Sequence, residues 1–124
     1  MSAESQIKAT IQTYFDCMYE SSADKARDAF HSNAKITGFM GGNLLEMSVT
    51  DFANFVAGQV PSPKDKEETL LCEILSIEIA GDTAVARVRD EYMGNTFLDT
   101  LSLIKVDETW AIYNKLFHVE KSSA

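Results

Sequence analysis

Several classes of protein are excluded by what this 124-residue sequence lacks. No stretch approaches the ~20 apolar residues that span a bilayer, and the N-terminal residues lack the basic flank and apolar run of a signal peptide. We therefore expect a cytoplasmic protein with no membrane partner. Basic residues number 11 against 19 acidic ones. The resulting net charge of −8 repels phosphates, so nucleic acid is not an expected partner.

Motifs for metal, nucleotide or covalent chemistry are also missing. The two cysteines, Cys17 and Cys72, cannot form a disulfide framework and are predicted to be reduced, buried small side chains. The two histidines, His31 and His118, lie far apart, and no element carries the ligand spacing of a metal site. The pair Gly41-Gly42 is not followed by the Lys-Ser/Thr of a phosphate loop. We expect no metal and no cofactor, so any catalysis would be acid–base chemistry by side chains.

Helical periodicity dominates the first half of the chain. Apolar side chains at helical spacing predict a helix over residues 3–19. The capping pattern at Ser21 begins a second short helix that ends near His31, and the same pattern at Ser48 begins a third that Gly58 ends. Between the second and third helices, a glycine turn joins two short strands.

Alternation with a period of two dominates the second half and predicts four long strands. Because strands of ~10 residues are ~33 Å long, the sheet must twist and curl, and helices on its concave side would enclose a cavity. The chain is predicted to fold as one α+β domain, residues 1–124, in which a curved antiparallel sheet packs on three N-terminal helices. The long strands are predicted at residues 69–79, 83–93, 96–106 and 109–119.

The order helix, helix, short hairpin, helix and four-strand meander resembles a known superfamily. Together with Ala29-Phe30, Asn33–Ile36 and the closing segment Glu108–Phe117, it resembles the cone-shaped nuclear-transport-factor-2-like (NTF2-like) superfamily. The segment Phe97–Val106, which leads to Trp110, looks most like its SnoaL-like, "putative lumazine-binding" branch. The superfamily includes ketosteroid isomerases, polyketide cyclases, dehydratases and domains that only bind ligands or proteins, so fold alone selects no activity.

The ketosteroid isomerase pattern matches this chain at two of three positions. By this resemblance, Tyr14 corresponds to the tyrosine of the oxyanion hole and Asp99 to its protonated aspartic acid. Gly38 stands where the proton-abstracting aspartate would be, so the expected base is missing.

Asp99 and Tyr14 each allow a second interpretation. Apolar neighbours that share its strand face would partly bury Asp99 and favour its neutral form, a donor to a ligand carbonyl. Alternatively, Asp99 pairs with Arg87 or Arg89 on the neighbouring strand. Tyr14 lies within the apolar stripe of its helix, where its ring packs in the core whatever its hydroxyl does.

The alternation of side chains along the last predicted strand gives a third candidate catalytic residue. His118 and Asn114 share parity with Trp110, so they would face the cavity if the tryptophan does. His118 would then lie near the cavity mouth as a general acid or base; the alternative is a surface histidine. The charged run 89–91 is interpreted as a solvated strand end.

Three hypotheses about function follow. The first is a domain that binds a small hydrophobic molecule without catalysis. The second is an isomerase, cyclase or dehydratase for a hydrophobic carbonyl compound, in which Asp99 and Tyr14 polarise the carbonyl and His118 moves a proton. The third is a dimeric interaction module that uses the outer sheet face. The residues predicted to line the pocket are Met18, Phe30, Phe39, Met47, Phe52, Phe55, Leu101, Leu103, Trp110 and Asn114.

Overall fold

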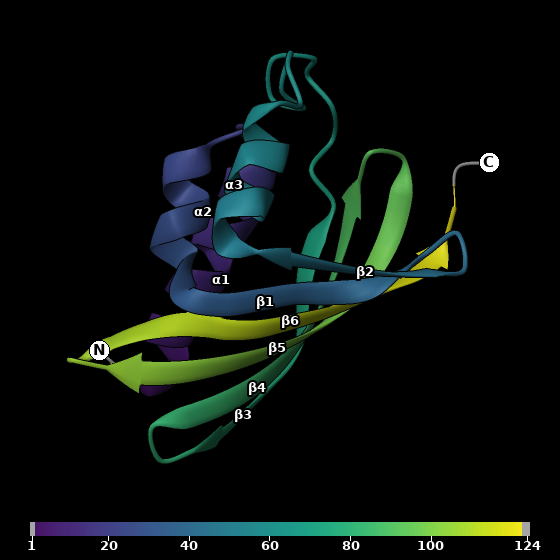
Figure 1. Ribbon diagram of the computed structural model, residues 1–124. Helices are drawn as coiled ribbons and strands as arrows, with labels where there is room; N and C mark the ends of the chain where they lie inside the picture. The colour runs from purple at the N-terminus through teal and green to yellow at the C-terminus, as the bar shows by residue number, and fades with distance from the viewer. Residues whose placement is uncertain (1, 123–124) are drawn as a thin grey trace.

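A computed structural model describes residues 2–122 as three helices packed against one side of a curved six-stranded sheet (Figure 1). The α+β fold with a curved sheet is confirmed. The helices are α1 (Ala3–Tyr19), α2 (Ala23–Ala29) and α3 (Val49–Ala57). The strands are β1 (Phe30–Met40), β2 (Asn43–Ser48), β3 (Cys72–Ala80), β4 (Thr83–Tyr92), β5 (Asn95–Val106) and β6 (Thr109–Lys121). No helix within residues 2–122 is long and apolar enough to cross a membrane.

The sheet is mixed rather than wholly antiparallel. Its strand order is β2-β1-β6-β5-β4-β3, and β1 pairs with β6 in parallel while the other neighbouring strands are antiparallel. Hairpin turns in the sequence reveal the antiparallel neighbours, because those strands follow one another along the chain. The parallel pair joins segments far apart in sequence, so no local signal announces it.

Serine caps begin the three helices. The hydroxyls of Ser2, Ser22 and Ser48 each accept a hydrogen bond from the backbone N–H three residues later, which satisfies a donor that the helix leaves free. The cap of α2 is therefore Ser22 and not Ser21. This helix also ends earlier than predicted, because Phe30 already begins β1.

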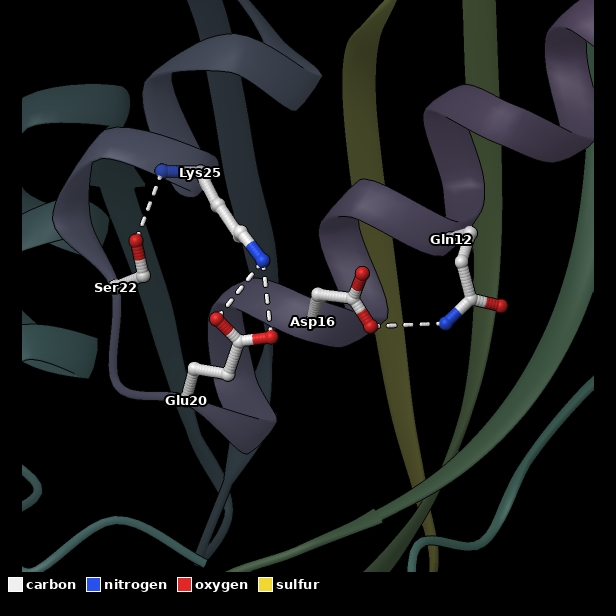
Figure 2. A network of polar contacts seen from close by, with 5 residues as sticks. All are labelled: Gln12, Asp16, Glu20, Ser22 and Lys25. Carbon is white, nitrogen blue, oxygen red and sulfur yellow. Dashed lines mark hydrogen bonds and ion pairs between the residues drawn. The ribbon is translucent and has the colours of Figure 1, made fainter. Parts of the chain in front are cut away.

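Polar side chains interact within α1 and at its junction with α2. Figure 2 shows Lys25 Nζ donating to both carboxylate oxygens of Glu20, at 2.8 and 2.9 Å, and Gln12 Nε2 donating to Asp16 Oδ1 at 2.9 Å. These pairs lie at the surface and contribute little individually. The enclosed side of the junction is apolar: Ala26 and Ala29 of α2 are fully buried in the core.

A β-bulge in β6 decides which of its side chains face the helices. Ser102 of β5 pairs with Asn114 and the next residue, Leu103, pairs with Ile112, so Tyr113 is an extra residue without a partner. The extra residue reverses the alternation beyond it. The prediction that His118 and Asn114 lie on the same face of the strand as Trp110 is therefore wrong.

The residues that face inward beyond the bulge are Lys115 and Phe117, and both are buried. Phe117 lies opposite Gly38 of β1. A Cβ atom built on Gly38 would stand 2.5 Å from the carbonyl oxygen of Phe117 and 2.6 Å from its ring. Glycine is thus required for this close approach, and the space of the missing isomerase base is filled by the Phe117 ring.

The Gly38→Ala variant is expected to lose about 1–3 kcal/mol of unfolding free energy, because its methyl group overlaps the backbone and ring of Phe117. Gly58→Ala is the matched control. A Cβ at Gly58 would make ordinary contacts, at 3.5 Å, with Asn54 and Phe55. Chemical denaturation of both variants measures the difference, and equal stabilities would contradict this account of Gly38.

Candidate ligand pocket

An apolar cavity of about 200 Å³ lies between the inner side of the sheet and helices α1 and α3. Four residues predicted to line the pocket do so: Met18, Met47, Phe52 and Phe55. The remaining wall comes from β1, β2 and the ends of β4, β5 and β6, and Lys115 is its one charged side chain. The additional lining residues are Ile36, Met40, Leu45, Tyr92, Met93, Phe97 and Phe117.

The other predicted lining residues lie elsewhere. Phe39 is 65% exposed, because alternation along β1 places Ile36 and Met40 toward the cavity and Phe39 on the outer side. Asn114 also falls on the outer side, past the bulge. Four predicted residues are buried in the core without lining this cavity: Phe30, Leu101, Leu103 and Trp110.

A buried chain of polar side chains lies between α1 and the sheet. The Tyr14 hydroxyl donates to Asp99 Oδ2 at 2.7 Å, and both residues are fully buried. Asp90 of β4 is also buried, on the same inner face as Asp99. The two carboxyl groups affect each other, because the negative charge of Asp99 acts on Asp90.

One proton explains how this acid pair is tolerated. As carboxylates, both oxygens of Asp90 and Oδ1 of Asp99 would have no donor among residues 2–122, which is costly for buried charges. Burial, followed by the charge of Asp99, raises the pKa of Asp90 well above its usual range. The raised pKa favours the neutral form of Asp90, which leaves one negative charge instead of two in the buried pair, while Asp99 accepts from Tyr14.

Lys115 joins the cavity to this acid pair. Its Nζ atom lies 4.7 Å from the centre of the Tyr14 ring, 4.9 Å from that of Phe52 and 5.8 Å from that of Phe117. Within residues 2–122 the amine makes no hydrogen bond and no ion pair at contact distance. Its positive charge nevertheless acts on Asp90, opposing the rise of the Asp90 pKa. The rings hold the amine in place while its N–H groups stay available.

The predicted catalytic residues are therefore dispersed. Tyr14 and Asp99 contact each other, but neither lines the cavity; their oxyanion roles stay predictions. His118 is exposed on the outer side, so its predicted place at the cavity mouth is wrong, for the bulge turns it away. Arg89 does not pair with Asp99: it binds Glu73 and Glu120 on the outer face.

Besides the additional lining residues, two charged residues of the site were not predicted from the sequence, Asp90 and Lys115. Alternation along the strand places Asp90 on the face opposite Arg89, which is a signal for burial, whereas the prediction of a solvated strand end at 89–91 follows the charge of the run. The structure buries Asp90 instead. Lys115 gave no such signal, because its inward direction depends on the bulge at Tyr113.

Other chemistry has little support in this part of the chain. Burial raises the pKa of the Cys17 thiol to about 12, so it stays protonated at neutral pH and is a poor nucleophile. Across residues 2–122, no three side chains of His, Cys, Asp or Glu gather in a cluster able to hold a metal ion.

The Asp90→Asn variant tests whether Asp90 holds a proton in the folded protein. Because the pKa of Asp90 is raised from its ordinary 3.8, the unfolded chain loses this proton at lower pH than the folded one. The stability that Asp90 contributes is full below 3.8 and falls as pH rises toward the raised value. Replacing Asp90 should flatten that decline by up to about 1.4 kcal/mol per pH unit.

Unfolding of the wild type and Asp90→Asn, measured from about pH 4 to 8, makes this comparison. Asp82→Asn, at an exposed turn residue, is the control and should retain the wild-type slope. A slope of Asp90→Asn equal to that of the wild type would show that no proton is held at this position.

Known proteins resemble this chain over almost its whole length. "Aldolase FrzH" of Cladobotryum sp is 25% identical over 112 residues, which cover 89% of this chain and 86% of that protein. An NTF2-like protein of unknown function from Silicibacter pomeroyi superposes with a TM-score of 0.87, at 23% identity, over 97% of this chain and 100% of its own. Another, from Methylobacillus flagellatus, gives 0.83 at 27% identity over 97% and 95%.

The family assignment rests on a match that begins at residue 2 and ends at residue 118. This match spans the three helices, the whole cavity wall and nearly all of β6. The chain belongs to the family described as "Putative lumazine-binding", within the NTF2-like superfamily.

Proposed function

We propose that this protein binds a small, mostly apolar molecule that presents one carbonyl or other acceptor oxygen to Lys115. The observation that carries the proposal is the contrast within the cavity wall, where a single amine stands among apolar and aromatic side chains. A ligand oxygen would accept a hydrogen bond from Lys115 Nζ, while the rest of the ligand contacts Met47, Phe52 and Phe97.

The cavity volume limits the size of the ligand. An apolar cavity of about 150 Å³ holds benzene, so a cavity of about 200 Å³ accommodates one ring with a short substituent. The thioethers of Met18, Met40 and Met47 line the wall and adapt easily to different shapes. A modestly larger ligand would then fit by rearrangement of flexible side chains.

The name of the family refers to lumazine, and the wall composition does not suit it. Lumazine is a pteridine whose ring edges carry several nitrogen and oxygen atoms that need hydrogen-bond partners. The wall offers the Lys115 amine and the Tyr92 hydroxyl, so most of those atoms would remain unpaired at a high energetic cost. A ligand with one polar edge suits this cavity better.

Catalysis on a carbonyl compound is a second candidate. The relative from Cladobotryum sp is named an aldolase, and aldol reactions need a polarised carbonyl group. Lys115 is placed to polarise one, whereas isomerisation through an aspartate base has no support at Gly38, whose space Phe117 occupies.

Binding is tested by acetophenone, a one-ring ketone, in a thermal unfolding assay. At ten times its dissociation constant the ligand should stabilise the wild type by about 1.4 kcal/mol, which raises Tm by about 5 °C. Leu45→Trp, at the rim of the cavity, should abolish the shift by filling the space.

Leu44→Trp is the matched control, since Leu44 is the neighbouring residue on β2 and does not line the cavity. It should retain the wild-type shift. An unchanged Tm of the wild type, or equal shifts in the two tryptophan variants, would overturn the proposed binding site.

The outer sheet face supports a further proposal, that two copies of the chain associate through it. Its exposed apolar side chains include Phe39, Leu44, Val85 and Leu116. Phe39 and Leu44 are direct partners across the β1–β2 hairpin, so they share one face. An apolar surface of this kind on a sheet is commonly covered by a partner.

Light scattering of Leu116→Glu tests the dimer. The wild type should have twice the monomer mass, and the buried charge should reduce the variant to a monomer. Leu70→Glu, an exposed leucine in the loop before β3, should remain dimeric. A monomeric wild type would contradict the proposal.

A further inference from the structure

We propose that Lys115 forms a covalent imine with an aldehyde or ketone bound in the cavity. This inference rests on the proposed binding function and specifies its ligand class as a carbonyl compound. It starts from the position of one atom, Nζ of Lys115, which is the one amine in the cavity wall formed by residues 2–122.

The surroundings of Lys115 differ from those of several other lysines. Lys8, Lys25, Lys66 and Lys105 each pair with a glutamate near the surface. Lys115 is buried and contacts aromatic rings instead, and its amine makes no hydrogen bond within residues 2–122. A carbonyl group that enters the cavity therefore meets an amine that no carboxylate holds in an ion pair.

The reaction needs no further reagent. Lys115 first gives the proton of its ammonium group to water. The lone pair of the resulting neutral Nζ then attacks the carbonyl carbon, a C–N bond forms, and the π electrons of the carbonyl move to its oxygen. The two hydrogens of the amine then leave with this oxygen as water while the C=N bond forms. Atoms and electrons balance without an oxidant, a reductant or a metal ion.

The buried acid chain lies behind the reacting amine. The Tyr14 ring lies against Lys115 Nζ, and its hydroxyl donates to Asp99, which interacts with Asp90. None of these three residues lines the cavity, so they do not reach the ligand, and Asp90 interacts with Lys115 through charge. In the imine-forming reaction described above, carbinolamine formation and loss of water both require a proton to move between nitrogen and oxygen.

The apolar wall also favours persistence of the imine. Hydrolysis reverses its formation and requires water at the C=N carbon, yet the rings of Phe52 and Phe117 lie beside the amine and Phe97 lines the same cavity. Exclusion of water from such a site suppresses the side reaction. An imine also makes the adjacent C–H bond more acidic, which would suit bond formation or cleavage next to a carbonyl group.

Reductive trapping with benzaldehyde tests the inference. Sodium cyanoborohydride converts an imine to a stable secondary amine, which intact-mass spectrometry and peptide mapping locate. The wild type should carry the benzyl group mainly on Lys115, and Lys115→Met should lose this label. Lys35→Met, at an exposed lysine of β1, should keep it.

Lys115→Arg provides a second variant, which retains the positive charge but cannot form the imine; it keeps the test valid if the methionine variant does not fold. Labelling confined to surface lysines, or equal labelling of the wild type and a folded Lys115 variant, would overturn the inference.

Benzyl alcohol, which has the same ring but no carbonyl group, separates this inference from the binding proposal. A rise in Tm with benzyl alcohol and no label on Lys115 would refute the imine and leave the binding site standing. Absence of both would refute both proposals. A Tm shift together with a Lys115 label supports both.

Discussion

The extra residue in β6 is the constraint on which the candidate site depends. Tyr113 has no partner on β5, and from that point the strand presents Lys115 and Phe117, rather than Asn114 and His118, to the helices. A one-residue shift of register exchanges the two faces of a strand completely. The cavity would otherwise have an amide and an imidazole in its wall. With the bulge, the charged group that residues 2–122 contribute to the wall is one amine, and Phe117 closes the space beside Gly38.

The buried charges then become mutually dependent. Asp90, Asp99 and Lys115 would each be costly alone in an apolar interior. Here Asp99 accepts from Tyr14, the raised pKa of Asp90 favours its neutral form, and three aromatic rings surround the Lys115 amine. The arrangement leaves the amine without a hydrogen-bond partner of its own in this part of the chain, which is unusual for a structural lysine and favourable for a ligand.

The sequence predicted the elements better than it predicted the site. Long-range periodicity gave the three helices and the four long strands, because burial of one face imposes a repeating pattern on the residues themselves. It also placed Tyr14 and Asp99 in the interior, where they contact each other. The parallel pairing of β1 with β6 and the bulge at Tyr113 have no local signature. Each position that depends on them, notably Lys115, His118 and the partner of Gly38, was therefore missed or misplaced.

The most direct test of this account is the NMR signal of the Lys115 ε-methylene group, assigned by its loss in Lys115→Arg. Rings on two sides of the amine should shift these protons upfield from those of the exposed Lys35, and added acetophenone should shift them again. A Lys115 signal that coincides with that of Lys35 and does not respond to acetophenone would mean that the side chain points to solvent. The bulge would then not direct this strand as described, and the candidate site would not exist.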